Sequence, residues 1–264
     1  MAPAIGVFDS GFGGLTVLRE LQQVLPTASY LYFGDTAHLP YGAKSVRTVA
    51  KYAIAAAHFL EQHGIEMLVI ACNTATALAF DDIRTAVKVP VVGVVEPGAA
   101  RAAAISRTKK AVVAATEATV SSHAYQRALA RHGVEATEKA CPLFVPLVEE
   151  GWVEHRVTEE VAHIYMDEVF QDGARNADVL VLGCTHYPLL RPLLRRVVPP
   201  HVEIVDSAES TAAKVAEMLG KNRAQGQPGE LRCYATDSVE KFRRLGGKFL
   251  GRPIENIELV DIEK

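Results

Sequence analysis

Short apolar runs alternate along the chain with longer stretches in which apolar residues recur at helical spacing. The short runs are β-branched or continuously apolar, which is typical of parallel strands covered on both faces. They predict strands at Ile5–Phe8, Tyr30–Phe33, Met67–Ala71, Val91–Val95, Ala111–Ala115, Val179–Leu182, Glu203–Val205 and Leu231–Tyr234.

The amphipathic stretches predict helices between these strands. The clearest runs from Ser45 to His63, where apolar side chains share one stripe and Gly64 then supplies a C-terminal stop. Four more helices are expected at Leu15–Leu25, Thr119–His132, Thr158–Gln171 and Ser207–Leu219. The polar, glycine-containing segment 220–229 is expected to be a surface loop.

Strand–helix alternation of this kind predicts an α/β fold with parallel sheets. Two segments also resemble each other, namely Leu68–Thr74 and Leu180–His186. Each is an apolar strand followed by a small residue, a cysteine and two polar residues that open a helix. This similarity predicts two similar α/β halves, each with a thiol at the end of a strand; chance similarity between two α/β units is the alternative.

Composition and charge exclude several classes of protein. The 264 residues carry a net charge of −3, and 49% are hydrophobic and 22% charged, as in ordinary globular proteins. A near-neutral balance argues against nucleic-acid or membrane-surface binding, both of which need a clustered basic face. The apolar runs are far shorter than a membrane span, and the first residues lack the basic region of a secretory signal. We therefore expect a cytoplasmic protein.

The four cysteines are too few and too scattered for a disulfide framework. Cys141 and Cys233 are expected only to pack, as most free cysteines do. Cys72 and Cys184 differ, because each lies where a strand stops and a helix starts, at the ligand-binding end of a sheet. A thiol at a helix N-terminus is expected to have its pKa lowered.

Three kinds of chemistry use such thiols. A redox pair would normally show Cys-x-x-Cys, and a lone nucleophile would need only one cysteine. Two thiols in matching contexts suit proton transfer on opposite faces of one carbon, where each group serves as acid or base. The matched contexts favour this last hypothesis.

The segment Asp9–Gly14 follows the first predicted strand and offers backbone N–H groups to an anion. A dinucleotide fingerprint would need glycine where Thr16 stands, so NAD binding is disfavoured although Asp35 ends the second strand. A carboxylate-binding loop with Asp9 beside a thiol is the preferred interpretation. A tight turn in which Asp9 caps the helix is the alternative.

Other polar residues complete the candidate set. The turn at Pro40–Gly42 offers backbone donors, and Thr116 and Thr119 follow a strand, where they either bind substrate or cap the next helix. His186 lies two residues after Cys184, where a Cys-x-His metal half-site is the rival, but the sequence has no second pair at metal-like spacing. We therefore predict no metal site.

Five motifs together resemble the glutamate racemases of the aspartate/glutamate racemase family. They are Ile5–Val17, Tyr32–Gly42, Ala71–Thr76, Phe144–Gly151 and Gly183–Pro188, in family order. The resemblance implies two similar α/β domains with parallel-rich sheets and the active site at their interface. The first domain would comprise residues 1–95 plus about 207–264, and the second about 96–206.

The resemblance implies cofactor-independent interconversion of L- and D-glutamate, which supplies D-glutamate for peptidoglycan. The implied catalytic residues are the acid/base pair Cys72 and Cys184, assisted by Asp9, His186 and Glu149. The implied substrate contacts are Asp9, Ser10, Tyr41, Gly42, Asn73, Thr74, Thr119, Thr185 and His186. Family members often have glycine where Ala115 stands, so Ala115 and Glu117 could alter the substrate pocket.

These motifs contain no arginine, so neutral donors are expected to bind the substrate carboxylate. The expected partners are glutamate and a second copy of the chain, in a homodimer. Three other functions stay open: racemisation of aspartate or another small amino-acid derivative, non-catalytic carboxylate binding, and thiol oxidoreduction.

Overall fold

The computed structural model describes residues 4–172, 174–220 and 227–262. Within them the strands form two sheets, one of six strands in the order β10-β9-β2-β1-β3-β4 and one of four in the order β6-β5-β7-β8. All the strand pairings in this part of the chain are parallel. The predicted α/β fold with parallel sheets is confirmed.

The six-stranded sheet consists of β1 Ala4–Asp9, β2 Tyr30–Gly34, β3 Ile65–Ile70, β4 Val91–Gly93, β9 Leu231–Ala235 and β10 Ile257–Leu259. Its helices are α1 Leu15–Val24, η1 Tyr41–Ala43, α2 Val46–Gln62, α3 Asn73–Ala86, α10 Ser207–Leu219 and α11 Val239–Leu250. The four-stranded sheet consists of β5 Lys110–Ala115, β6 Glu135–Ala140, β7 Val179–Gly183 and β8 Glu203–Asp206. Its helices are α4 Val95–Ile105, α5 Glu117–Ser121, α6 Ala124–Arg131, α7 Phe144–Glu149, α8 Arg156–Asp172, η2 Tyr187–Leu190 and α9 Arg191–Val197.

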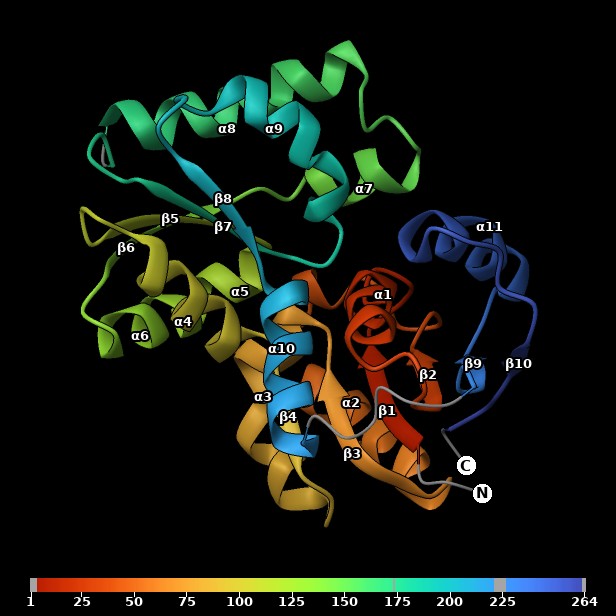
Figure 1. Cartoon of the computed structure of the whole chain (residues 1–264). Helices are drawn as coiled ribbons and strands as arrows, with labels where there is room; N and C mark the ends of the chain where they lie inside the picture. Colours follow the sequence, from red (N-terminus) through yellow and green to blue (C-terminus); the bar gives the residue numbers. More distant parts are fainter. Residues whose placement is uncertain (1–3, 173, 221–226, 263–264) are drawn as a thin grey trace.

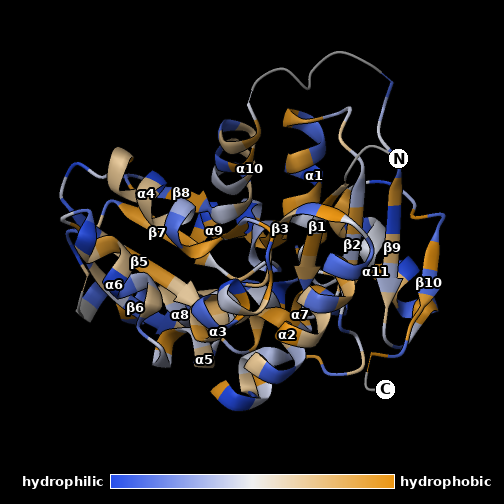
Figure 2. Ribbon diagram, turned by 90° about the horizontal axis from the view of Figure 1, so that it is seen from below, coloured by the Kyte–Doolittle hydropathy of each residue, from blue (hydrophilic) through white to orange (hydrophobic). Residues whose placement is uncertain are grey.

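Helices cover both faces of each sheet, as the apolar strands require (Figure 1). On the six-stranded sheet, α2 and α3 bury one face, while α1, α10 and α11 cover the other. On the four-stranded sheet, α4 and α6 cover one face, and α8 and α9 the other. Figure 2 shows central strands such as β5 and β7 as predominantly apolar segments between these helices.

The two sheets are connected by two crossings of the chain and by direct packing between their helices. The chain passes from β4 into α4 and returns from β8 into α10, and α10 contacts both α1 and α4. One apolar cluster includes side chains from β1 and from β7, so the two halves share part of a core. The domain boundaries at residues 95 and 207 stay a prediction.

The structure corrects several predicted elements. The strand expected at Val91–Val95 ends at Gly93, and Val95 already belongs to α4. The single helix expected at Thr119–His132 is two helices, because His123 adopts a left-handed conformation with φ of 52° between them. Strands β6 and β10 were not predicted, since both are edge strands without an apolar run, and β10 has only three residues. Of the expected loop at 220–229, residues 221–226 lie outside the described residues.

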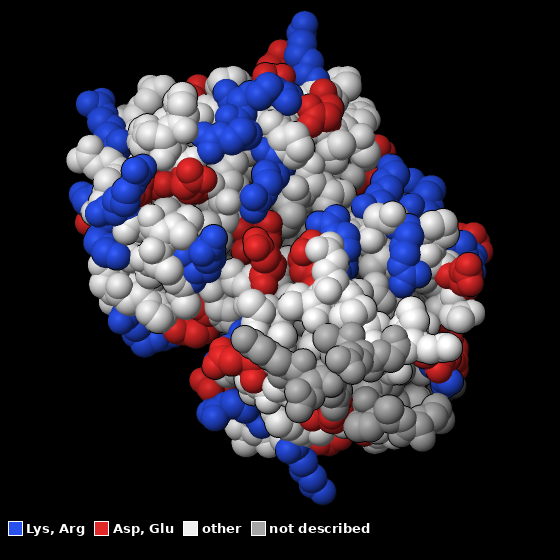
Figure 3. Space-filling model, viewed as in Figure 1, with Lys and Arg blue, Asp and Glu red and all other residues white. Residues whose placement is uncertain are grey.

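The distribution of charged side chains on the surface agrees with the near-neutral net charge of the sequence. Basic and acidic side chains are interspersed on the face shown in Figure 3. No helix in the described part of the chain has the length and apolar character needed to span a membrane. Cys141 and Cys233 are buried in the apolar core, as predicted.

Candidate active site

Cys72 lies two residues after the end of β3 at Ile70 and forms the N-cap of α3. Its sulfur accepts the N–H of Ala75 at 3.4 Å and donates to the hydroxyl of Ser10 at 3.6 Å. Burial, reinforced by the charge of Asp9, raises the pKa of the Cys72 thiol to about 12. The prediction that the helix N-terminus lowers this pKa is therefore wrong, because loss of solvation outweighs the backbone dipoles.

Cys184 follows β7 in the second sheet. The segment after it is a short 3-10 turn from Tyr187, and an α-helix begins only at Arg191. The predicted helix N-terminus at Cys184 is thus a weak one. Burial again raises the pKa of the thiol; the backbone N–H of His186 opposes that effect, and the charges of Cys72 and Asp9 add to it. Both thiols are therefore protonated near neutral pH.

Both thiols line one narrow cavity of about 40 Å³ between the two sheets. Its lining includes ten of the predicted residues: Ser10, Tyr41, Gly42, Cys72, Asn73, Thr74, Glu149, Cys184, Thr185 and His186. The lining also includes Gly11, Phe12, Leu39, Pro40, Thr116 and Val145. Larger hollows, two of about 610 Å³ each, lie on the outer surface beside α3 and α4 and contain neither thiol. The cavity between the sheets is therefore where thiol chemistry can occur.

Two buried polar atoms at this site, Oδ1 of Asp9 and Nδ2 of Asn73, have no hydrogen-bond partner among the described residues. Nε2 of His186 makes no hydrogen bond by strict geometry either, but it lies in ion-pair contact with Oε1 of Glu149 at 3.4 Å. A buried polar atom without a partner costs free energy, on the order of 1–3 kcal/mol. An acceptor and a donor left free in this way match the ammonium and carboxylate groups of an amino acid.

Asp9 lies just behind the cavity wall at the end of β1. Its Oδ2 accepts the N–H of Gly11 at 3.0 Å, and its side chain is almost fully buried. Burial raises the pKa of Asp9, while the charge of His186 and the backbone N–H groups of the loop act in the opposite direction. A raised pKa makes this carboxylate a stronger base than an exposed aspartate.

Three threonine hydroxyls form a cluster between the sheets. Thr74 contacts Thr116 at 3.0 Å and Thr119 at 3.2 Å, and Thr116 contacts Thr119 at 2.9 Å. Thr116 lines the cavity, whereas Thr119 is fully buried behind it and supports the other two. Neither Ala115, which is buried in the core, nor the exposed Glu117 belongs to the cavity lining.

Tyr41 and Gly42 reach the cavity through a turn that is held from behind. The hydroxyl of Tyr41 donates to Asp35 at 2.6 Å, and Asp35 also contacts His38 at 2.8 Å and Thr236 at 2.9 Å. Asp35 is thus a buried anchor for the turn. Gly42 approaches Thr116 so closely that a Cβ atom would lie 2.8 Å from the threonine Cβ.

His186 is held between Cys184 and Glu149. Its Nδ1 lies 4.0 Å from the sulfur of Cys184, and its Nε2 lies 3.4 Å from Oε1 of Glu149. Burial acts to raise the pKa of Glu149, but contacts with His186 and Lys241 outweigh it and lower the pKa. Glu149 is therefore ionised and can stabilise a protonated His186.

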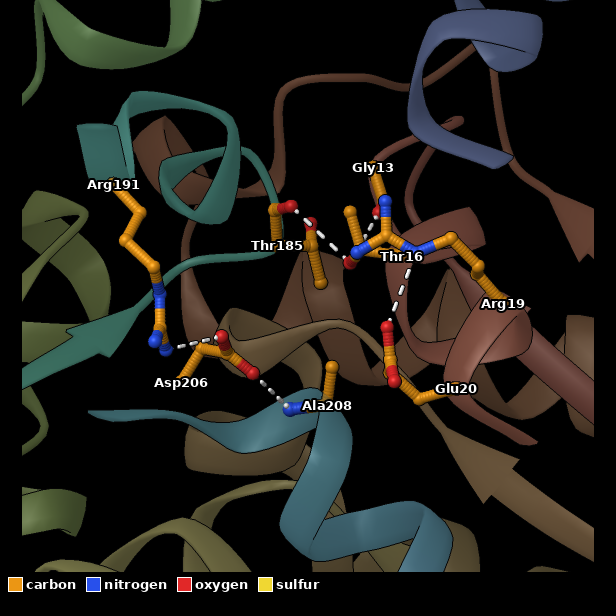
Figure 4. A network of polar contacts seen from close by, with 8 residues as sticks. All are labelled: Gly13, Thr16, Arg19, Glu20, Thr185, Arg191, Asp206 and Ala208. Carbon is orange, nitrogen blue, oxygen red and sulfur yellow. Dashed lines mark hydrogen bonds and ion pairs between the residues drawn. The ribbon is translucent and has the colours of Figure 1, made fainter. Parts of the chain in front are cut away.

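A hydrogen bond across the two sheets positions the turn that carries Cys184. The hydroxyl of Thr16, on α1, lies 3.0 Å from the carbonyl oxygen of Gly13 and 3.3 Å from that of Thr185 (Figure 4). On the other side of the same view, Arg191 donates to Asp206, which also caps the start of α10. Residues from both halves thus fix the site.

Comparison with known proteins identifies the family. A model of the Asp/Glu/Hydantoin racemase family matches residues 5–215. The chain belongs to this family of racemases. A glutamate racemase of Koribacter versatilis is 58% identical, over 98% of each chain. The predicted resemblance is confirmed, and it places the chain among isomerases.

Solved racemases share the whole fold. The glutamate racemase of Francisella tularensis, in complex with D-glutamate, superposes with a TM-score of 0.91 at 34% identity, covering 99% of this chain and 98% of that one. The glutamate racemase of Thermus thermophilus, in complex with β-chloro-D-alanine, superposes with a TM-score of 0.88 at 43% identity, with the same coverage.

Some residues of this candidate site were not predicted. Phe12, Leu39 and Val145 line the cavity, yet their apolar side chains carry no chemical signal in a sequence. Lys241 contacts Glu149 from α11, 92 residues further along the chain. Thr116 was predicted, together with Thr119, either to bind substrate or to cap the next helix, but only Thr119 was among the implied substrate contacts, whereas Thr116 is the one that lines the cavity.

Proposed function

We propose that this protein interconverts L- and D-glutamate by transferring protons at the α-carbon through Cys72 and Cys184. The observation that carries the proposal is the placement of two buried thiols, one after a strand of each sheet, in the lining of a single cavity. The glutamate racemases that the chain matches over nearly its full length support glutamate as the substrate.

The proton balance uses both thiols in turn. One sulfur, as the thiolate, takes the α-proton, so that a C–H bond breaks and an S–H bond forms. The other thiol then donates its proton to the opposite face of the carbanion, and inversion results. Since burial keeps both thiols protonated in the free protein, a base must first remove one proton. We assign that task to Asp9 for Cys72 and to His186 for Cys184.

The unpaired polar atoms supply the substrate contacts. Oδ1 of Asp9 would accept from the amino group, and Nδ2 of Asn73 would donate to a carboxylate oxygen. The oxygen of Asn73 accepts from the hydroxyl of Tyr125 at 2.6 Å, which turns its amide nitrogen away from that contact. Ser10, Thr74 and the N–H groups near Thr185 add neutral donors. Donors fixed in a buried site stabilise developing negative charge more strongly than water does.

The remaining parts of the proposal concern the cellular setting. We place the reaction in the cytoplasm, where D-glutamate would serve peptidoglycan synthesis. The four cysteines, all of them free thiols, fit such a reducing compartment. We also keep the homodimer as a proposal, which light scattering of the purified protein would test.

The deciding experiment incubates L-glutamate with the purified protein in D2O without added cofactor. Polarimetry should show loss of optical rotation, and NMR should show loss of the α-hydrogen. Cys72→Ser and Cys184→Ser should each lower the rate by at least about a hundredfold, because each removes the proton carrier of one face. Cys141→Ser changes a core thiol outside the cavity and should leave the rate unchanged.

Two outcomes would contradict the proposal. Full activity in either Cys72→Ser or Cys184→Ser would exclude the two-thiol mechanism. Faster turnover of L-aspartate than of L-glutamate would assign the site to the smaller substrate.

A further inference from the structure

A chain of contacts continues beyond the residues assigned to the reaction. From Cys184 it runs to His186 and from there to Glu149, and the second oxygen of Glu149 accepts from Nζ of Lys241 at 3.0 Å. The side chains of His186 and Glu149 are mostly buried, at 11% and 16% exposed, whereas that of Lys241 is 40% exposed. The chain of contacts therefore leads from the thiol to the surface.

The contact between Glu149 and Lys241 joins the two halves of the molecule. Glu149 ends α7, which belongs with the four-stranded sheet, and Lys241 lies in the first turn of α11, which covers the six-stranded sheet. The two helices lie next to each other in both ribbon views (Figures 1 and 2). The ion pair thus fastens α11 to the side of the site that carries Cys184.

Lys241 fixes the orientation of the Glu149 carboxylate. A carboxylate rotates about its last carbon–carbon bond, so holding one oxygen on Lys241 directs the other oxygen to Nε2 of His186. The same helix also holds the imidazole by packing, since the ring of Phe249 meets that of His186 edge-on at 5.0 Å. Lys241 itself lies 5.6 Å from the centre of the Phe12 ring, which lines the cavity.

We propose that Lys241 is a positioning residue for proton transfer at Cys184, acting through Glu149 and His186. This inference rests on the proposed racemase function. It predicts an effect confined to one face of the substrate, because Lys241 contacts Glu149 and the ring of Phe12 but, within the described residues, forms no hydrogen bond or ion pair with Cys72, Ser10 or Asp9 on the other face.

Kinetic isotope effects can detect such a one-sided change. The equilibrium constant of racemisation is one, so every variant must keep equal kcat/KM for the two enantiomers. A slower transfer at Cys184 nevertheless makes that step more rate-limiting. The primary isotope effect on kcat/KM should then increase for the 2-deuterated enantiomer that gives its proton to Cys184, and decrease for the other. Partial unfolding or general loosening would leave both isotope effects unchanged.

The experiment compares five variants of the whole chain, one of which is Glu149→Gln alone as the parent of a double variant. Lys241→Met should lower kcat/KM about tenfold. It should also raise the isotope effect for the enantiomer that gives its proton to Cys184 and lower the isotope effect for the other enantiomer. Lys241→Arg should restore most of the rate, because it preserves the charge. Arg244→Gln removes an exposed cation from the same helix and should change neither quantity. In a Glu149→Gln background, Lys241→Met should have no additional effect, since the two residues act in series.

A readout that does not depend on activity completes the test. The ring-nitrogen NMR signals of His186 should shift in Lys241→Met and stay in place in Arg244→Gln. Unchanged isotope effects, or unchanged His186 signals, would overturn the role of Lys241. If the wild-type protein leaves glutamate unchanged, the proposed function fails, and the His186 signals alone decide whether Lys241 positions this histidine.

Discussion

Replacing Gly13 with alanine tests whether the spacing between the two halves of the site governs the reaction. A Cβ atom at this position would lie 2.3 Å from Oγ1 of Thr185 and 2.6 Å from Nδ1 of His186, where ordinary contact begins at 3.4 Å. The imidazole cannot easily turn aside, because Phe12 and Phe249 pack against it. The turn that carries Cys184 must therefore retreat by about 1 Å, which can reduce a rate about a hundredfold.

Polarimetry of L-glutamate would measure this loss, and urea denaturation would measure the accompanying cost of overpacking, which we expect to be about 1–3 kcal/mol. Gly247→Ala is the matched control, because its Cβ atom would make only ordinary contact, with its closest neighbour at 3.5 Å. That variant should racemise normally and gain about 0.5–1 kcal/mol from helix propensity. A Gly13→Ala protein that turns over glutamate at the wild-type rate would refute the reasoning.

Two further predictions follow from the electrostatics. Because burial raises the pKa of Cys72 to about 12, its thiolate fraction at pH 7.5 is about three thousand times smaller than that of free cysteine, whose pKa is about 8.5, and iodoacetamide should label Cys72 correspondingly more slowly. Rapid labelling of Cys72 in the native protein, judged by mass spectrometry, would contradict this. Burial opposes ionisation of Asp178, but hydrogen bonds from Ser106 and from the N–H groups of Thr108 and Arg107 lower its pKa to about 2. A lowered carboxyl pKa stabilises the fold above the unfolded value near 3.8 and loses this effect as pH falls toward 2. Asp178→Asn should thus cost about 1–2 kcal/mol at pH 7 in urea titrations, with the difference from wild type shrinking between pH 4 and pH 2.

The central strands could be predicted from sequence because burial on both faces leaves a continuous apolar run. β1 and β7 show this directly, since all their residues are buried. The edge strand β6 has the sequence Glu-Ala-Thr-Glu-Lys-Ala, in which no such run exists. An edge strand pairs on one side only, so its sequence is under weaker constraint.

The site was partly predictable for a similar reason. Polar residues that directly follow apolar strands, such as Cys72 and Cys184, carry a local signal. Lys241 has no such local signal in the sequence, because its proposed role depends on how α11 lies against α7. The direction of the thiol pKa shift also escaped prediction, since it depends on how deeply each sulfur is buried rather than on which residues adjoin it.

The close approach of Gly42 to Thr116 has a consequence for how the protein tolerates change. This contact lies where the two halves meet, and each half supplies one of the sulfur atoms. The distance between the two sulfur atoms therefore depends on how the halves pack against each other and not on any single loop. Substitutions elsewhere along the interface between the halves can change this distance while the side chains that line the cavity stay the same. Under the proposed function, the rate of turnover can then be adjusted separately from substrate recognition.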